Sequence, residues 1–358
     1  MTDQTMRADW SRPYRVVQWA TGNVGSRAMQ RVIEHPGMEL VGVWVSNPDK
    51  VGRDAGELCD IAPVGVKATN SIDDVIALKP DCVLYMPHVN RVDEVCRILE
   101  SGINIVSTRM EYQNPAGLDP ADRAAIEAAC QKGGTSIHAT GSSPGFISEA
   151  MPIVLTSIAR RVDKLTITEF ADTSSRNSPE MLFGPMMGFG EPAGRINEGM
   201  MHHMIHSFSP SLNLIAEAWG MPFDDVQARQ AQGIARKDVV IPAGTAKAGT
   251  VAATKTVVSC LHKGKPLIEF QAIWYISSDV DTTDGEEWNF RKSGWHVLVE
   301  GDTPLDITIG YPVSDEDYPG FTPNLTAHRP VNCVPYVCAA KPGFVTTLDL
   351  PQVVARLA

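Results

Sequence analysis

A short apolar strand that runs directly into a glycine-containing turn lies near the start of the chain, from Tyr14 to Gly25. Apolar residues at helical spacing follow the turn, and His35-Pro36-Gly37 ends that helix before a second apolar run over residues 38–45. Strand, helix and strand in this order predict a βαβ unit, whose turn glycines let the backbone approach a pyrophosphate at the helix N-terminus. The predicted contacts to a dinucleotide in this turn are Thr21, Gly22, Asn23, Val24 and Gly25.

The glycine pattern of this turn is incomplete. The usual fingerprint has a further glycine near the end of the strand, where this chain has Trp19, Ala20 and Thr21. Two glycines alone would also fit an ordinary βαβ unit with a tight turn and no ligand. The complete strand, helix and strand around them favours dinucleotide binding.

The end of the second strand bears on which dinucleotide binds. A site specific for NAD usually holds the ribose hydroxyls with an acidic residue at this point, but residues 40–48 contain no acid, and Lys50 and Arg53 follow. A neutral strand end with nearby cations suits the additional phosphate of NADP, unless the two cations belong to a solvated loop. We therefore predict that NADP is preferred or that NADP and NAD are both used, with contacts from Ser46, Asn47 and Lys50.

Length and composition predict an enzyme that works free in solution. The 358 residues are 43% hydrophobic and 20% charged, which is enough for a sizeable core in two domains. The formal net charge of -11 argues against a nucleic-acid partner. The first residues lack the apolar core of a signal peptide, and no apolar run is long enough to span a bilayer. We expect no membrane partner and a cytoplasmic location.

Strands and helices continue to alternate as far as about residue 150, which predicts a parallel sheet in a Rossmann-type α/β domain. Two of the apolar runs end at Met86 and Ser107. Because ligands of such sheets bind beyond the carboxyl ends of the strands, the residues after each run are expected to face the same crevice as the glycine turn. Three more cofactor-binding residues are predicted on this basis: Pro87, His88 and Thr108.

From about Lys164 the pattern changes to β-branched and aromatic runs, several of which alternate with polar residues. Such alternation predicts a mostly antiparallel, open sheet with one solvated or partner-facing side. Residues 200–219 are expected to form a helix, which makes this a second, α+β domain. We predict a dinucleotide-binding domain over residues 1–150, completed by a C-terminal helix over 325–358, and a substrate and dimerisation domain over 151–324 that forms a homodimer.

Glu111 is the candidate catalytic residue. It follows a predicted strand by one short loop and is expected to lie in the cofactor crevice. A dehydrogenase that acts on an amine or a carbonyl needs a group beside the nicotinamide that holds ammonia or an iminium, or moves a proton. A surface glutamate with a capping role is the alternative interpretation.

Three further patterns receive structural interpretations. Residues 141–145 fit the Gly-x-Ser-x-Gly pattern of hydrolases, but Pro144 has no N–H for an oxyanion hole, so a tight turn at the cofactor crevice is favoured. His202, His203 and His206 lack a glutamate at zincin spacing, and no metal site is predicted. Four aromatic residues of the second domain are expected in its core or an interface, or else in a substrate pocket wall: Trp274, Tyr275, Trp288 and Trp295.

Four stretches of the chain together resemble a known family. They are residues 19–25, 108–111, 139–146 and 329–335. Their joint occurrence and order resemble the dihydrodipicolinate-reductase-like dehydrogenases, and most closely the branch of 2,4-diaminopentanoate dehydrogenase and the native amine dehydrogenases, some of them from mycobacteria. The resemblance spans nearly the whole chain and implies a Rossmann domain completed by the C-terminal helix, plus an α+β domain.

The resemblance also implies a reaction, in which Glu111 corresponds to the family's catalytic glutamate. A small aldehyde or ketone, ammonia and NAD(P)H would give an amine, with the reverse deamination permitted, while Glu111 deprotonates ammonium and then stabilises the iminium. Phe146, next to the cofactor turn, is the predicted substrate contact. The histidine pair and lysine of true dihydrodipicolinate reductases are absent near Asp172 to Asn177, which argues against their reaction. The alternatives are an NADPH-dependent imine or carbonyl reductase and a non-catalytic NADP-binding sensor.

Overall fold

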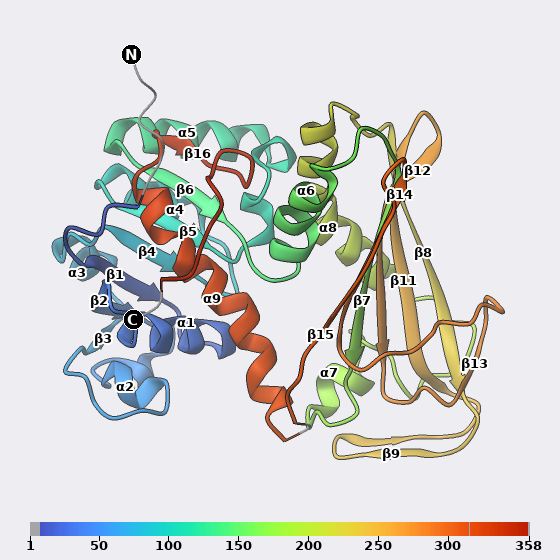
Figure 1. Cartoon of the computed structure of the whole chain (residues 1–358). Coiled ribbons are helices and arrows are strands. Elements are labelled where there is room, and N and C mark those ends of the chain that lie inside the picture. Colours follow the sequence, from blue (N-terminus) through green and yellow to red (C-terminus); the bar gives the residue numbers. More distant parts are fainter. Residues whose placement is uncertain (1–7, 315, 357–358) are drawn as a thin grey trace. The chain divides into compact units, whose positions relative to one another are not determined.

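The computed structural model describes residues 8–314 and 316–356. The chain divides into two compact units (Figure 1). Unit 1 combines the N-terminal part of the chain up to Phe146 with the segment from Gly320 onward, and unit 2 comprises Ile147–Pro319. Among the described residues, no helix combines the length and the apolar character that a membrane crossing requires.

A seven-stranded sheet forms the centre of unit 1, and its strands follow the order β16-β6-β5-β4-β1-β2-β3. Every neighbouring pair is parallel. The strands are β1 (Tyr14–Trp19), β2 (Met38–Trp44), β3 (Ala68–Thr69), β4 (Cys82–Tyr85), β5 (Asn104–Ser107), β6 (Ser136–Ala139) and β16 (Gly343–Phe344). The strand order reverses at β1, which has β2 on one side and β4 on the other, and α/β sheets bind ligands at such a point.

Helices cover both faces of this sheet (Figure 1). Alternation along β1 explains the two layers, because Val16 packs into one hydrophobic cluster and its neighbour Val17 into the other. The helices of the first layer are α1 (Asn23–Ile33) and α9 (Tyr318–Cys338), and those of the second are α3 (Ile72–Ala77), α4 (Val92–Glu100) and α5 (Pro120–Gly133). With both faces buried, the strands are near-continuous apolar runs, as parallel sheets require.

The C-terminal helix α9 packs on the sheet of unit 1 through a stripe that includes Ala327, Val331 and Val334. It spans Tyr318–Cys338, whereas the sequence pattern predicted a helix from 325 to the end of the chain. Residues 339–356 are not helical, because Gly343 has a φ of 131°, which lies outside helical geometry, and the chain is extended there. The chain instead adds the short edge strand β16 beside β6.

A second seven-stranded sheet lies in unit 2, in the order β13-β8-β11-β12-β7-β14-β15. Its pairs are antiparallel except for β12 with β7. The strands are β7 (Val162–Asp172), β8 (Asp225–Ala235), β11 (Val251–His262), β12 (Lys265–Tyr275), β13 (Val280–Thr282), β14 (Gly294–Gly301) and β15 (Leu305–Gly310). This mixed but mostly antiparallel sheet has two free edges, at β13 and β15.

Helix α8 (Glu198–Trp219) packs on one face of this second sheet. Phe208 of α8 stacks on Phe270 of β12, with ring centroids 3.8 Å apart. The remaining short elements are α2 (Ala55–Leu58) in unit 1, and α6 (Met151–Thr156), α7 (Pro179–Phe183) and the hairpin of β9 (Val239–Ile241) and β10 (Gly244–Ala246) in unit 2. The predicted fold class is confirmed: a Rossmann-type parallel sheet with helices, and an α+β part with a mostly antiparallel sheet.

Candidate functional site

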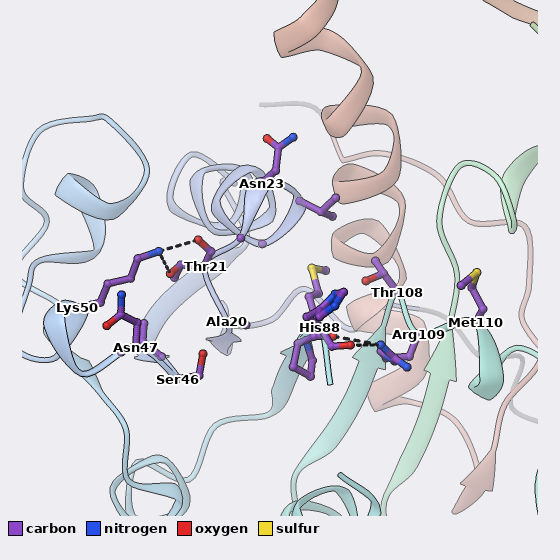
Figure 2. Close-up of a pocket in the computed structure, with 16 residues that line it drawn as sticks. Ala20, Thr21, Asn23, Ser46, Asn47, Lys50, His88, Thr108, Arg109 and Met110 are labelled. Atoms are coloured by element: carbon purple, nitrogen blue, oxygen red, sulfur yellow. Dashed lines mark hydrogen bonds between the residues drawn. The ribbon is translucent and has the colours of Figure 1, made fainter. Parts of the chain in front are cut away.

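A cavity of about 510 Å³ lies in unit 1, where the chain leaves the carboxyl ends of the central strands (Figure 2). The connections after β1, β2, β4 and β5 all open on this edge of the sheet, as expected for a parallel sheet. Every residue predicted to contact the cofactor lines the cavity, namely Thr21, Gly22, Asn23, Val24, Gly25, Ser46, Asn47, Lys50, Pro87, His88 and Thr108. The other lining residues are Ala20, Val45, Met86, Arg109 and Met110.

The turn between β1 and α1 follows a glycine-type path although alanine stands at its start. Ala20 adopts a left-handed backbone with φ of 73°. The buried side chain of Gln18 donates from Nε2 to the carbonyl oxygen of Ala20 at 2.9 Å, and this hydrogen bond stabilises the turn. Gly25 lies against the same carbonyl, because a Cβ at Gly25 would come within 2.3 Å of that oxygen. The backbone of the turn therefore follows the path of a glycine-containing turn, although the glycine pattern is incomplete.

The N-terminus of α1 opens on the cavity. Gly22 precedes the first helical residue, no side chain caps this end, and the first turn carries no acidic residue. A Cβ built at Gly22 would meet no atom within 4 Å, so the space beside the backbone is open. Uncapped N–H groups and the helix dipole both favour an anion here. The residues present therefore fit a dinucleotide pyrophosphate.

The left-handed conformation of Ala20 leads to a prediction about stability. An L-residue other than glycine pays about 1–2 kcal/mol for this conformation, while glycine costs about 0.5–1 kcal/mol in lost chain entropy. We expect Ala20→Gly to leave the free energy of unfolding unchanged or to raise it by up to about 1 kcal/mol, and Ala20→Val to lower it. Urea unfolding of the three proteins measures the difference. A marked destabilisation by Ala20→Gly would contradict the left-handed assignment.

Lys50 reaches from the short 3₁₀ helix Pro48–Lys50, which follows β2, to the turn after β1 (Figure 2). Its Nζ donates to the carbonyl oxygen and the hydroxyl of Thr21, at 3.2 and 3.1 Å. Arg53, the second cation after β2, is exposed and does not line the cavity. None of the residues that line the cavity is acidic. The side of the cavity next to β2 therefore holds one fixed positive charge from Lys50.

Glu111 lies in the 3₁₀ helix Met110–Tyr112, directly after β5. It does not itself line the cavity, but the three residues before it do. Arg109 donates from Nε, at 3.1 Å, and from Nη2 to one carboxylate oxygen of Glu111, Oε1. The other oxygen, Oε2, has no hydrogen-bond partner among the described residues. Because the Glu111 side chain is 20% exposed, a small ligand can reach it.

Arg109 is a residue of the site to which the sequence analysis gave no role of its own. Its Nη1 donates to the carbonyl oxygen of His88 at 2.7 Å (Figure 2). The same guanidinium therefore joins the segment after β4 to Glu111, which follows β5. A guanidinium is a planar, rigid fork of donors, and it fixes the carboxylate more closely than a lysine would. The signal in the sequence was a cation two positions before the candidate carboxylate in a strand-end loop.

Two buried tyrosines lie near this loop. Burial raises the pKa of Tyr85 to about 12. Burial also raises the pKa of Tyr112, whose hydroxyl donates to Oδ1 of Asn90 at 2.6 Å. Both phenols stay protonated at neutral pH, so neither supplies a general base and Glu111 remains the candidate for that role.

The turn 141–145 follows β6 and leads to Phe146. Oγ of Ser143 is buried without a hydrogen-bond partner among the described residues, so it lacks the adjacent base that a hydrolase serine needs. Arg329 of α9 donates to the Thr140 hydroxyl at 3.0 Å and lies 5.7 Å from the centre of the Phe146 ring. Phe146 does not line the cavity, and its role as a substrate contact stays a prediction.

The histidines singled out in the sequence lie on α8. His202, His203 and His206 are all exposed. Within residues 8–314 and 316–356, no three histidine, cysteine, aspartate or glutamate side chains are grouped as a metal ion would require. These histidines are therefore interpreted as polar residues of a helix surface.

The four aromatic residues of the second domain separate between the two faces of its sheet. Tyr275 and Trp288 share one buried cluster. Trp274, the neighbour of Tyr275 in β12, faces the other side, as alternation along a strand requires. There Trp274 and Trp295 both donate from their indole nitrogens to the carboxylate of Glu169.

The sequence of this chain is similar to two protein families and to individual proteins of known activity. Residues 16–139 match the family described as dihydrodipicolinate reductase, N-terminus, and residues 146–358 match the family described as 2,4-diaminopentanoate dehydrogenase C-terminal domain. An amine dehydrogenase of Streptomyces virginiae is 27% identical over 94% of this chain and 95% of its own length. A 2,4-diaminopentanoate dehydrogenase of Acetoanaerobium sticklandii is 24% identical over 94% and 93%.

A solved structure has the same fold over nearly its full length. The amine dehydrogenase of Mycobacterium smegmatis superimposes with a TM-score of 0.72 at 22% identity, covering 97% of this chain and 98% of that one. The match to the diaminopentanoate dehydrogenase C-terminal domain covers more than half of the chain. The chain therefore belongs to the family defined by the 2,4-diaminopentanoate dehydrogenase C-terminal domain, joined to an N-terminal domain of the dihydrodipicolinate reductase type, and is an oxidoreductase of that family.

Proposed function

We propose that the chain is an NAD(P)H-dependent amine dehydrogenase, which converts a small aldehyde or ketone and ammonia into an amine and also catalyses the reverse oxidative deamination. The observation that carries this proposal is the position of Glu111, one residue beyond the lining of a cavity that fits a dinucleotide. The names of two relatives, an amine dehydrogenase and a 2,4-diaminopentanoate dehydrogenase, support chemistry at a carbon that bears nitrogen.

Glu111 has the properties that such a reaction needs. With Oε1 held by Arg109, Oε2 accepts a proton from ammonium, and the ammonia released adds to the carbonyl carbon. Glu111 returns this proton to the hydroxyl group of the carbinolamine, which leaves as water, and the regenerated carboxylate stabilises the iminium cation that remains. A dinucleotide held in the cavity by the turn of residues 21–25 would supply the hydride for the iminium carbon. In balance, one carbonyl compound, one ammonium ion and one reduced dinucleotide give one amine, one water and one oxidised dinucleotide.

The proposed cofactor is NADP, used in preference to NAD or together with it. The support is the charge at the side of the cavity next to β2, where Lys50 lines the wall beside Ser46 and Asn47 and no lining residue is acidic. An acidic residue would favour the free ribose hydroxyls of NAD, whereas a cation favours the added phosphate of NADP.

Lys50→Ala is expected to lower kcat/KM for NADPH by about tenfold and to change kcat/KM for NADH by less than about twofold, because only NADPH carries the phosphate that the ammonium would bind. Arg53→Ala is the matched control, since Arg53 is exposed and does not line the cavity. Initial rates with each cofactor give both ratios. Equal losses for the two cofactors, or a larger effect of Arg53→Ala, would contradict the assignment of Lys50.

A panel of aldehydes and ketones tests the proposed activity itself. Each compound is supplied with NADH or NADPH, with ammonium and without it. The proposal requires that oxidation of the cofactor depends on ammonium. A carbonyl reductase would oxidise the cofactor equally well without ammonium, and a non-catalytic sensor would bind NADPH without oxidising it under any of these conditions.

A further inference from the structure

A second cavity, of about 520 Å³, lies within unit 2. All of its lining residues fall within 183–254, and none of them lines the dinucleotide cavity of unit 1. They come from the end of α7, the segment between α7 and α8, the start of α8, and strands β8 and β11. The proposed reaction leaves this cavity without a role.

Two glutamine side chains of β8 hold the segment that forms one wall of this cavity. Oε1 of Gln232 accepts from the backbone N–H of Gly194 at 2.8 Å, and its Nε2 donates to the carbonyl oxygen of Arg195 at 2.8 Å. Oε1 of Gln230 accepts from the backbone N–H of Asn197 at 3.0 Å. Because these hydrogen bonds fix the backbone of the segment on the sheet, the cavity is preformed.

Thr254 of β11 lines the cavity beside these glutamines. It lies opposite Gln232 in the sheet and is only 8% exposed. The hydroxyl of Thr256, two residues further along the same face, accepts from Nε2 of Gln230 at 3.2 Å. The hydroxyl of Thr254, in contrast, has no hydrogen-bond partner within residues 8–314 and 316–356. A buried hydroxyl without a partner is costly, so a polar atom of a ligand that bonds to it is stabilised.

Much of the remaining lining is apolar. Its side chains are those of Phe183, Pro185, Met187, Ile196 and Val251. Apolar walls with a few polar groups are typical of sites for small organic molecules. The flexible thioether of Met187 also lets the wall adapt to the shape of an aliphatic chain.

The charged residues of the lining are Glu191, Arg195 and Glu198. All three are exposed, so they mark the side of the cavity that opens to solvent. Arg195 pairs with Glu191 at 3.9 Å, whereas Glu198 pairs with no cation in the part of the chain that the structure describes. Glu198 stands in the first turn of α8, where the helix dipole favours its carboxylate and a second anion would be repelled. The opening therefore favours a cationic ligand group.

We propose that this cavity binds an aliphatic amine that carries a hydroxyl or carbonyl oxygen at its other end. The neutral oxygen bonds to Thr254, the chain packs on Phe183 and Met187, and the ammonium group faces Glu198. The charged end lies at the exposed carboxylate, because an ammonium group at the buried end would lose its hydration without an anion to replace it. The proposal goes beyond the proposed function, since only residues of unit 2 take part.

Isothermal titration of the full chain, without any dinucleotide, tests this site by binding alone. Three matched ligands are used in a series of chain lengths: an aminoalkanol, the alkylamine with a methyl group in place of the hydroxyl, and the diol with a hydroxyl in place of the ammonium group. At the best length we expect the aminoalkanol to bind about five- to tenfold more tightly than the alkylamine. Its advantage over the diol should be about three- to fivefold, because Glu198 is exposed. Equal affinity for all three, or no saturable binding of any aminoalkanol, would overturn the proposal.

Each end of the ligand is assigned to one residue, and two variants test the assignments separately. Thr254→Val keeps the size of the side chain and suits a strand, so it should bind the aminoalkanol no better than the alkylamine, with the affinity for the alkylamine within about twofold of wild type. Glu198→Gln should bind the aminoalkanol no better than the diol. Glu180→Gln is the matched control, because Glu180 is exposed on α7 and does not line the cavity. Unchanged aminoalkanol binding in either Thr254→Val or Glu198→Gln would contradict the proposal.

Glu111→Gln separates this site from the proposed active site, where an amine is also expected to bind. The Glu111→Gln protein should bind the aminoalkanol with an affinity within about twofold of wild type. Loss of binding in Glu111→Gln, with normal binding in Thr254→Val and Glu198→Gln, would place the ligand beside Glu111 and refute the second site. Binding that depends on Thr254 and Glu198, in a protein that aminates no ketone, would refute the proposed function and leave the second site intact.

A further pair of variants covers the case in which Thr254→Val does not fold. Thr254→Ser keeps a hydroxyl and should retain the preference for the aminoalkanol over the alkylamine, whereas Thr254→Ala should lose it. Far-UV circular dichroism reports whether each variant has the wild-type secondary structure. A folded Thr254→Ala protein that keeps the preference would contradict the role of the Thr254 hydroxyl.

Discussion

Replacing Glu111 by glutamine is expected to lower kcat for reductive amination by about 10²- to 10⁴-fold, the range typical for loss of a general base. Glutamine keeps an oxygen that can accept from Arg109, so the loop after β5 should hold its shape. It cannot take a proton from ammonium, and it offers no negative charge to an iminium. Because Glu111 does not line the dinucleotide cavity, the dissociation constant for NADPH should stay within about twofold of wild type.

Fluorescence titration with NADPH and initial rates with ammonium and a ketone measure the two quantities. Glu39→Gln is the matched control, because Glu39 is exposed on β2 and does not line the cavity. A Glu111→Gln protein that aminates at the wild-type rate would show that the base is elsewhere. If wild type and Glu111→Gln both bind NADPH and neither oxidises it, the protein is a non-catalytic sensor.

Replacing Gly25 by alanine is expected to disturb both the fold of unit 1 and its cofactor site. The new Cβ would lie 2.3 Å from the carbonyl oxygen of Ala20 and 3.0 Å from Nε2 of Gln18, so the turn has to shift. Overpacking of this kind lowers the free energy of unfolding by about 1–3 kcal/mol. Loss of one hydrogen bond to a charged phosphate weakens binding by about tenfold or more.

Gly22→Ala separates the two effects of Gly25→Ala. A Cβ at Gly22 meets no atom within 4 Å, so the free energy of unfolding should be unchanged in this variant. Urea unfolding and NADPH titration of both variants provide the comparison. If Gly25→Ala matched wild type in stability and in affinity, the close approach of α1 to the turn would be refuted.

The dinucleotide cavity could be predicted from the sequence because its residues share one simple property. Each follows a strand of a parallel sheet, and such strands all end at the same edge. The approach of Gly25 to the β1 strand end likewise follows from a helix that begins directly after a strand. The left-handed backbone of Ala20 could not be predicted, since alanine rarely adopts it and the contact from Gln18 that holds the turn is a matter of side-chain packing.

Hydrogen bonds between residues of different loops could not be predicted from the sequence patterns. The bonds of Arg109 to Glu111 and to the carbonyl of His88 depend on the paths of two separate loops, and periodicity says nothing about these paths. The same holds for Lys50 and Thr21, although both residues were assigned to the cofactor site.

Strand β8 shows where the pattern for the second sheet failed. Its sequence, from Asp225 to Ala235, is rich in glutamine and alanine and has no β-branched or aromatic run. Pairing with β11 along its whole length determines its structure, and that pairing is a tertiary effect. The expected homodimer and cytoplasmic location stay predictions.

The central claim is that one active site joins ammonia, a carbonyl carbon and a hydride. Cyclohexanone is incubated with the wild-type protein, NADPH that carries deuterium at the transferred position, and ammonium labelled with heavy nitrogen, and the products are analysed by mass spectrometry. We predict cyclohexylamine that contains both labels, and almost none of it with Glu111→Gln. Deuterated cyclohexanol formed at the same rate without ammonium, in place of the doubly labelled amine, would contradict the account.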